Sequence, residues 1–355
     1  MSYYFFIFLI TLLPSISYST NNPDFRSLDC VSILEFSSAS RQLRVSKLTD
    51  KNHPVFKDEI QGEVIEEFET IRLFHKEGRI PNDSFHPYAK TTSARLLLLH
   101  GLSTNISDSS TLRGPLINFV RTQFRERSKN KTKKEPVINV LLENQDYIRF
   151  GAEAIDLPFH GYGPNNKKYW QTKQAAIWLG NYIINMKKEA PELPIFIISR
   201  STSSVLASLS LQNEEIRQSI SGLIFVSPSW PNEPEIIQYG VSDLMSIASQ
   251  KNGLFLNDIG MAWAINLLHS ESWNQFNFYN IPTLILIGKD DPQVHESERL
   301  HFQNLASQHS NIHFKEIEDG KHDLLGIQNS NNKDRRASIN TYLSIYSFAS
   351  DVLNL

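Results

Sequence analysis

The stretch PIFIISRSTSSVLASL (Pro194–Leu209) combines a short apolar run, a polar turn and an apolar helical pattern. The run Pro194–Ile198 predicts a buried strand, and the pattern after the turn predicts a helix over Ser203–Gln212. A turn between a strand and a helix projects its middle side chain above the sheet, and the helix N-terminus presents N–H groups that stabilise negative charge. Ser201 occupies that middle position, which makes it the candidate nucleophile.

The residues that flank Ser201 weaken this assignment when it is taken alone. The usual pattern of such a turn is G-x-S-x-G, whereas Ser199 and Ser203 occupy both glycine positions here. A side chain at a left-handed or crowded backbone position costs on the order of 1 kcal/mol or more. A turn rich in Ser and Thr at a helix start is also more often a helix cap than a nucleophile. The order of the neighbouring motifs therefore decides the assignment.

Upstream, the apolar run Ala94–Leu99 predicts another strand, which leads directly into His100-Gly101-Leu102. The glycine allows the backbone N–H of Leu102 to point into the site. We expect the backbone N–H groups of Leu102 and Thr202 to be the two donors that stabilise an oxyanion. His100 is expected to hold its turn by hydrogen bonds.

Downstream, two further strand ends carry a carboxylate and an imidazole. The run Thr283–Ile287 is followed by Gly288, and Asp291, our choice for the acid, lies three residues after this glycine. Asp290 is the alternative if the register differs by one residue. The stretch Asn311–Ile317 predicts the next strand, and His322 lies in the loop behind it, where a general base is required.

Short apolar runs alternate with longer amphipathic stretches along the chain, which is typical of strands that feed helices across a parallel sheet. Continuous Leu, Ile and Val runs suit central strands that helices bury on both faces. The other expected strands are Ala152–Ile155 and Gly222–Val226, and the other expected helices are Thr111–Arg127, Thr172–Lys188 and Arg335–Leu353.

Four motifs follow one another in the chain: the HG turn at His100, the DLPFHG turn at Asp156, the turn at Ser201, and the pair Asp291 and His322. With this order, the sequence from Arg95 to the C-terminus resembles the α/β-hydrolase superfamily, most closely its lysophospholipase and monoacylglycerol-lipase branch. It departs from that family at the two elbow serines and at Phe159, where the family often has glycine.

The resemblance implies an α/β-hydrolase fold, in which a mostly parallel central sheet is flanked by helices and carries a small helical cap. It also implies that Ser201, Asp291 and His322 form the catalytic triad of a serine hydrolase. The family needs no cofactor for this chemistry.

The pattern predicts one hydrolase domain over residues 20–355, with a cap inserted at about 231–280. The cap contains apolar side chains that either line an acyl-chain pocket or pack the cap on the body. A basic loop at 129–135 is expected to be a solvated surface loop.

Composition excludes several classes of partner and site. The formal net charge is −3, with 35 basic and 38 acidic side chains, which offers no field for a nucleic acid. Cys30 is the only cysteine, so no internal disulfide can form. No cluster of Cys and His has the spacing of metal ligands, so no metal site is expected.

The N-terminus carries an apolar run from Tyr3 to Leu13 that ends at Pro14 and small residues. Residues 1–19 therefore read as a signal peptide, and the protein is expected to be secreted or periplasmic. The run is shorter than the roughly 20 residues that a membrane-spanning helix requires. It lacks Lys and Arg in front of it, which leaves an uncleaved membrane anchor as the alternative.

These observations predict a serine hydrolase that cleaves a small-molecule or lipid ester, with lipid or lysolipid favoured by the apolar cap. A lipid substrate would bring transient contact with a membrane surface. Two alternatives remain open. A proline-type aminopeptidase would need an acidic group in the cap, for which Glu233, Glu235 and Asp258 are available. A binding protein that has lost turnover would explain the two missing elbow glycines.

Overall fold

The computed structural model describes residues 60–75, 93–101, 115, 119, 148, 150–160, 163–164, 166–228, 263, 280–326 and 332–354. The predicted signal peptide, Cys30, Leu102, the basic loop at 129–135 and all of the predicted cap except Trp263 and Asn280 lie outside the described residues. Within the described part of the chain, no helix is both long enough and apolar enough to cross a membrane.

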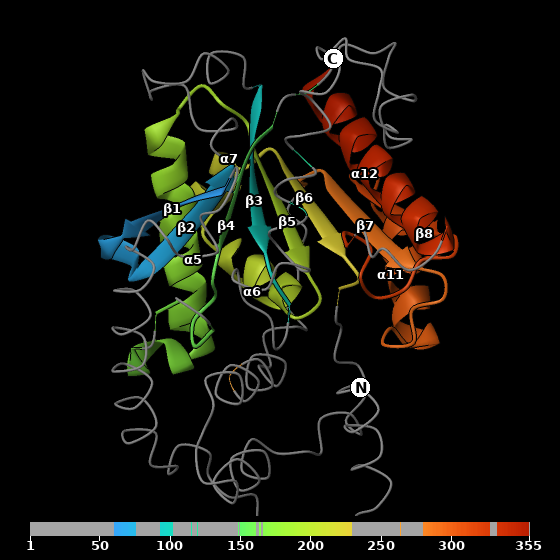
Figure 1. The fold of residues 1–355 in the computed structure, drawn as a ribbon, viewed down its shortest axis with the longest axis horizontal. Helices are drawn as coiled ribbons and strands as arrows, with labels where there is room; N and C mark the ends of the chain where they lie inside the picture. The colour runs from blue at the N-terminus through green and yellow to red at the C-terminus, as the bar shows by residue number, and fades with distance from the viewer. Residues whose placement is uncertain are drawn as a thin grey trace, which may run out of the picture.

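An eight-stranded sheet forms the centre of the molecule, in the order β1-β2-β4-β3-β5-β6-β7-β8 (Figure 1). The strands β3 to β8 all run parallel to one another, whereas β2 lies antiparallel to both β1 and β4. The strands are β1 Ile60–Ile65, β2 Thr70–His75, β3 Ala94–Leu99, β4 Phe150–Ile155, β5 Ile195–Arg200, β6 Gly222–Val226, β7 Thr283–Gly288 and β8 Ile312–Ile317. This order, with parallel strands feeding helices, is that of the α/β-hydrolase fold, and the predicted fold class is confirmed.

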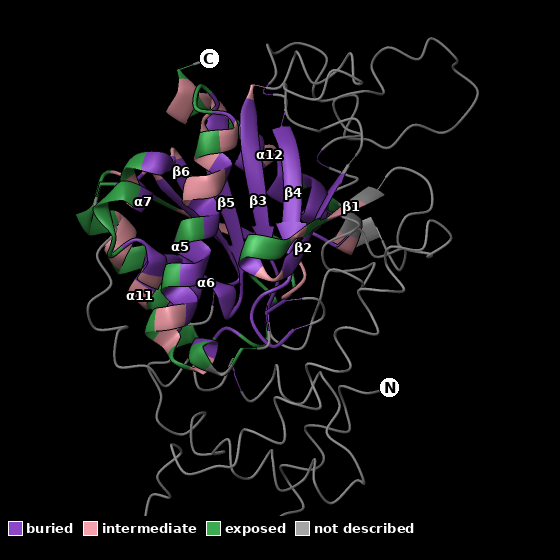
Figure 2. Cartoon of the chain, turned by 90° about the vertical axis from the view of Figure 1, so that its left-hand side faces the viewer, coloured by how far each residue is buried: buried purple, intermediate pink, exposed green. Residues whose placement is uncertain are grey.

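Helices cover both faces of this sheet. They are α5 Thr172–Glu189, α6 Ser203–Ser210, α7 Glu214–Ser219, α11 Glu296–Gln308 and α12 Asn332–Leu353, with short 3₁₀ turns η3 Glu66–Phe68 and η8 Lys167–Trp170. The predicted helix at 111–127 lies mostly outside the described residues, although Pro115 and Phe119 are helical. The central strands are buried throughout, and exposed residues gather on the outer helices (Figure 2).

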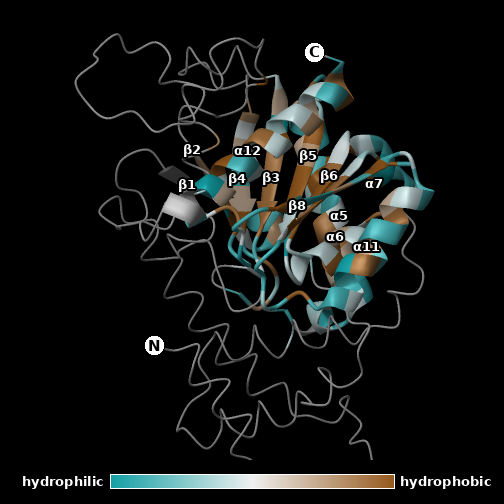
Figure 3. Cartoon of the chain, turned by 90° about the vertical axis from the view of Figure 1, so that its right-hand side faces the viewer, coloured by the Kyte–Doolittle hydropathy of each residue, from teal (hydrophilic) through white to brown (hydrophobic). Residues whose placement is uncertain are grey.

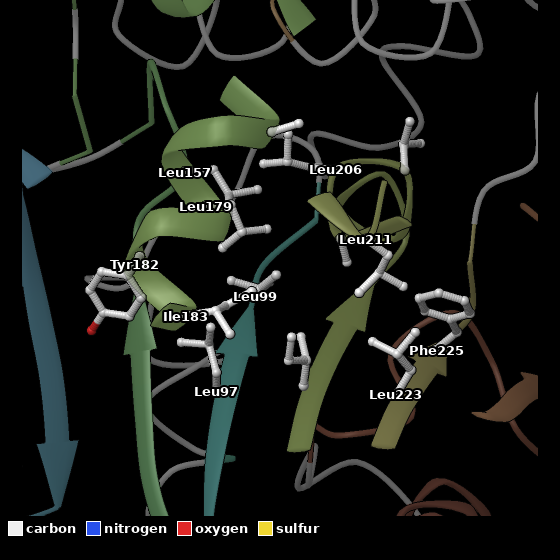
Figure 4. Packing of buried hydrophobic residues seen from close by; sticks show 14 of the residues in the cluster. Leu97, Leu99, Leu157, Leu179, Tyr182, Ile183, Leu206, Leu211, Leu223 and Phe225 are labelled. Atoms are coloured by element: carbon white, nitrogen blue, oxygen red, sulfur yellow. The ribbon is translucent and has the colours of Figure 1, made fainter. Parts of the chain in front are cut away.

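The apolar core is divided by the sheet into two layers. Along β3, Leu97 and Leu99 face the layer of α5, while Leu96 and Leu98 face the layer of α12. This alternation follows from the two-residue period of a strand. Figure 4 shows the first layer, in which Leu97 and Leu99 pack beside Leu179 and Ile183 of α5. Among the elements that the structure describes, the central strands are the most hydrophobic, as Figure 3 shows.

A largely buried cluster of four charged residues and one tyrosine lies between α5 and the strands β2, β3 and β4. We call Arg72, Arg95, Glu153, Tyr182 and Glu189 the Glu153 cluster. The Glu153 carboxylate accepts from Nη2 of Arg95 at 2.6 Å and from the Tyr182 hydroxyl at 2.8 Å. Arg72 and Arg95 also bond Glu189, at 2.8 and 3.1 Å. Burial alone would raise the pKa of Glu153, but the guanidinium groups of Arg95 and Arg72 hold it below its ordinary value.

Candidate active site

The turn at Ser201 joins β5 to α6 in a strained conformation. Ser201 has φ of 52°, in the left-handed region that residues with a Cβ rarely adopt. Its N–H donates to the carbonyl of Val226 at 3.1 Å, and its own carbonyl accepts the N–H of Ser204 at 3.1 Å. The sharp strand-to-helix turn is therefore formed without the usual flanking glycines, and Ser201 occupies its centre.

The two serines in the glycine positions behave differently. The Ser203 hydroxyl accepts the N–H of Arg200 at 2.8 Å and lies 2.9 Å from the Arg200 carbonyl, so it ties the turn together. It also lies 3.3 Å from the carbonyl of Leu99 on the neighbouring strand. The Ser199 hydroxyl is buried, and within the described residues it has no hydrogen-bond partner. Only one of the two substitutions is thus compensated by new bonds.

The HG turn after β3 packs directly against Ser201. A Cβ at Gly101 would lie 3.0 Å from Cβ of Ser201 and 3.7 Å from its Oγ, so a larger residue would crowd the candidate nucleophile. His100 is fully buried and holds this turn, because its Nε2 accepts the N–H of Leu157 at 3.0 Å and its Nδ1 lies 2.9 Å from the Gly101 carbonyl. Burial lowers the pKa of His100 well below its ordinary value, so the ring is neutral and structural.

The candidate oxyanion donors lie on either side of this contact. Thr202 directly follows Ser201 and precedes α6, and no described residue accepts a hydrogen bond from its backbone N–H. An N–H of this kind at a helix start can stabilise a developing negative charge. The second expected donor, the N–H of Leu102, lies just outside the described residues, next to Gly101.

The Asp291 carboxylate binds the His322 imidazole at the far end of the parallel sheet. Nδ1 of His322 lies 2.9 Å from Oδ2 of Asp291, and Oδ1 of Asp291 accepts the N–H of Gln293 at 2.9 Å. Burial by itself would raise the pKa of Asp291, but the hydrogen bond and charge of His322 and the N–H of Gln293 lower it. Asp291 is therefore ionised at neutral pH, which requires the proton on Nδ1 and leaves Nε2 as the basic nitrogen. Asp290 is exposed and does not make this contact.

Two glycines bring the loops of Asp291 and His322 together. A Cβ at Gly288 would lie 2.4 Å from the carbonyl oxygen of Gly320, and a Cβ at Gly320 would lie 2.9 Å from Cα of Gly288. The N–H of Asp290 also donates to the Gly320 carbonyl at 2.8 Å. The two loops thus touch through their backbones, which is the physical reason for the glycine three residues before Asp291.

The turn after β4 forms a rim at the same edge of the sheet. Phe159 has φ of 62° and is fully buried, with its ring 5.3 Å from that of Trp170. Trp263 packs on this rim as well, 5.8 Å from the ring of His160, and its indole N–H donates to the Tyr169 carbonyl at 2.9 Å. Of the apolar cap residues, Trp263 therefore packs against the body.

His160 is a second buried histidine beside this turn. Its Nδ1 lies 2.9 Å from the Pro158 carbonyl, and within the described residues its Nε2 has no partner. Burial lowers the pKa of His160 to about 4, so it is neutral at physiological pH. The contacts of His100 agree with the structural role that the sequence predicts for it, and the contacts of His160 indicate the same role.

The three candidate catalytic residues follow the carboxyl ends of β5, β7 and β8, which lie on one edge of the sheet. Sequence analysis missed Arg200 and Asp323, which flank Ser201 and His322 and form an ion pair at 3.4 Å. No pattern in the sequence signals that contact, since it depends on two loops meeting. Within the described part of the chain, no group of three or more His, Cys, Asp or Glu residues could hold a metal ion.

Several solved structures align with this chain at low sequence identity. No protein-family model matches the chain, and no curated protein sequence matches it. The structure of MenH from S. aureus aligns with a TM-score of 0.48 and 17% identity, over 74% of this chain and 95% of that one. A thermophilic esterase from Thermogutta terrifontis aligns with a TM-score of 0.47 and 15% identity, over 74% and 91%. A soluble variant of monoglyceride lipase from Saccharomyces cerevisiae aligns with a TM-score of 0.46 and 11% identity, over 83% and 97%.

Proposed function

We propose that the chain is a serine hydrolase that cleaves a carboxylic ester through an acyl-enzyme on Ser201. The observation that supports this most strongly is the 2.9 Å contact between His322 and Asp291, at the sheet edge that also carries the strained turn of Ser201. A nucleophile, an orienting acid and a base, in this order along the chain, are the components of acyl transfer.

In the proposed mechanism, Oγ of Ser201 attacks the ester carbonyl carbon while Nε2 of His322 takes the hydroxyl proton. Asp291 holds the ring in the required tautomer and stabilises the imidazolium. The carbonyl oxygen becomes an oxyanion, to which the N–H groups of Thr202 and Leu102 donate, each worth about 3 kcal/mol in the transition state. The tetrahedral intermediate expels the alcohol, which takes the proton from His322.

Deacylation repeats these steps with water in place of the serine. His322 takes a proton from water, the hydroxide attacks the acyl carbon, and Ser201 leaves with the proton returned by His322. The products are one carboxylic acid and one alcohol, so the reaction needs no cofactor.

For the substrate we favour a lipid or lysolipid ester, as the apolar composition of the stretch 231–280 suggests. The aminopeptidase alternative differs by requiring a bound ammonium group. The binding-protein alternative is disfavoured by the backbone strain at Ser201, because strain of this size persists only where the surrounding structure imposes it.

We also propose that residues 1–19 are a signal peptide and that the mature protein is secreted or periplasmic. Mass spectrometry of the protein recovered from an exporting host tests this. A mature N-terminus near residue 20 supports export, and an intact N-terminus in the membrane fraction supports the uncleaved anchor.

The deciding experiment compares wild type with Ser201→Ala on p-nitrophenyl esters of increasing chain length and on aminoacyl anilides. We expect the variant to lose at least about 10⁴-fold in kcat, the scale seen when a catalytic serine is removed. A fluorophosphonate probe should label the wild type and not the variant. Ser210→Ala is the matched control, because its hydroxyl bonds the Ala207 carbonyl in the same helix, away from the turn.

Each outcome selects one function. Preference for long-chain esters supports the lipid substrate, and preference for anilides supports the aminopeptidase. Equal turnover by wild type and Ser201→Ala, or a wild type that neither turns over nor takes the probe, would rule out the proposed hydrolase.

A further inference from the structure

Arg200 is a buried cation directly beside the candidate nucleophile. It is the last residue of β5, and its side chain is only 10% exposed. Its Nη1 lies 3.4 Å from Oδ1 of Asp323, and no other carboxylate of the described residues lies within ion-pairing distance. Within the same part of the chain, its Nε and Nη1 have no hydrogen-bond acceptor. A buried guanidinium is costly unless an anion compensates it, so Asp323 is the group that holds it.

Asp323 in turn belongs to a tightly fixed turn that begins at His322. Its Oδ1 accepts the N–H of Gly326 at 3.0 Å, and a Cβ at Gly326 would lie 2.2 Å from its Oδ2, so any larger residue there would displace the Asp323 carboxylate. Ser338 and Tyr342 of α12 donate to carbonyls of the same turn at 2.8 and 2.9 Å. A shift of the Asp323 side chain would therefore be transmitted to the backbone of the whole turn.

We propose that the Arg200–Asp323 ion pair sets the separation of Ser201 and His322, which makes Arg200 and Asp323 positioning residues for acyl transfer. Each partner is covalently bonded to one of the two residues that must exchange a proton. The backbone of Arg200 is fixed by the Ser203 hydroxyl, so the guanidinium extends from a rigid support. This inference rests on the proposed serine hydrolase and adds the device that aligns its nucleophile with its base.

A second ion pair at the site differs from the Arg200–Asp323 pair in its exposure to solvent. Lys289 and Glu318 also join two loops of the site, at 2.9 Å, but their side chains are 54% and 72% exposed. Exposed pairs are screened by water and contribute little to geometry. In the Arg200–Asp323 pair the side chains are only 10% and 17% exposed, and Arg200 has no other carboxylate partner among the described residues, so removing the pair should change the alignment.

The test measures kcat, KM and the fluorophosphonate labelling rate for Arg200→Met, Asp323→Asn, the double variant and Arg200→Lys. Misplacing reacting groups by about 1 Å can cost on the order of 100-fold in rate, so we expect kcat to fall about 10- to 100-fold with KM nearly unchanged. The double variant should be no slower than the slower single variant. Arg200→Lys should restore part of the lost rate, since it keeps the charge.

The double variant controls for loss of folding. It removes both charges, so neither partner is left as a buried charge without a counter-ion. Lys289→Met combined with Glu318→Gln is the control and should keep wild-type kcat. The inference is overturned if the Arg200/Asp323 double variant keeps wild-type kcat, or if the control variant loses as much kcat as the double variant does. Either result leaves the proposed function standing. Absence of turnover that depends on Ser201 in the wild type overturns the proposed function, and the inference with it.

Discussion

Two buried carboxylates, Glu153 in strand β4 and Asp291 in the loop after β7, have different surroundings. Both have a pKa below the ordinary value despite burial, which by itself would raise it. Glu153 faces the cations Arg95 and Arg72 and the Tyr182 hydroxyl, all fixed between strands and α5. Asp291 faces one backbone N–H and one imidazole whose side chain is 15% exposed.

The difference concerns which proton can move. Arginine keeps its protons at every accessible pH, so the Glu153 cluster holds fixed charges and can only contribute to structure. Histidine exchanges its proton near neutral pH, and one ring nitrogen of His322 is not engaged by Asp291. Proton transfer is thus expected where a buried carboxylate contacts a titratable side chain at the carboxyl ends of the strands. It is not expected in the Glu153 cluster, where the carboxylate contacts arginines.

The largest effect should come from Asp291→Asn. The amide cannot hold the imidazole in the Nδ1–H tautomer, so we expect kcat for ester hydrolysis to fall about 10⁴-fold. The free energy of unfolding, measured by urea denaturation, should change far less. A variant with near wild-type kcat would show that Asp291 is not the orienting acid, and Asp290→Asn is the matched control.

Glu153→Gln, in contrast to Asp291→Asn, should lower the stability and leave kcat unchanged. The substitution leaves Arg95 and Arg72 with only the more exposed Glu189 and Glu63 as acidic partners. Removing one partner of a buried ion pair costs about 3–5 kcal/mol in the free energy of unfolding. The kcat of the folded fraction should stay at the wild-type value. Glu63→Gln is the control, since Glu63 also pairs with Arg72 but is 36% exposed, and its loss should cost less than about 1 kcal/mol.

His160 is more deeply buried than His322, and its burial should make the free energy of unfolding depend on pH. Its pKa is lowered by burial to about 4 in the folded state, from an ordinary value of 6.5. The unfolded chain therefore binds the extra proton first, and stability is lost as the pH falls from 6.5 towards 4, by about 3 kcal/mol from this group. In urea denaturation at pH 7 and pH 4, His160→Asn should lose less stability between the two pH values than wild type. Equal losses would contradict the buried neutral state.

The smallest effects are expected at the two elbow serines. Ser199→Ala removes a buried hydroxyl that lacks a partner among the described residues, so it should raise the free energy of unfolding by up to about 1 kcal/mol. Ser203→Ala removes the hydroxyl that ties the turn and should lower it by about 1 kcal/mol. Thermal denaturation of both variants and wild type would show whether Ser199→Ala raises the free energy of unfolding while Ser203→Ala lowers it.

The central strands could be predicted from the sequence because their apolar runs are uninterrupted. The predicted bounds of β3 and β6 match the observed ones, whereas β5 extends two residues further, to Arg200, where pairing with β6 continues. The strands β1 and β2 were not predicted. In β2, Arg72 interrupts the apolar pattern because it belongs to the Glu153 cluster, and that burial becomes visible only when α5 is in place.

The helix α11 was missed for a different reason. Its start is capped by His295, which accepts the N–H of Ser297 while Glu298 bonds back to the His295 N–H, and histidine is an unusual residue for this role. The Asp291–His322 contact agrees with the pairing that motif order predicted. The ion pair of Arg200 and Asp323 could not be predicted, since neither residue belongs to a pattern that specifies its partner.

The contact between Gly288 and Gly320 has a mechanical consequence. Because their backbones touch, the loops that carry Asp291 and His322 form one stiff unit, and thermal motion displaces both side chains together. Fluctuations of the site should then occur mainly between this unit and the turn of Ser201. If the proposed hydrolase is redesigned for a bulkier substrate, the changes should be made at the turn of Ser201, and the paired glycines should be left untouched.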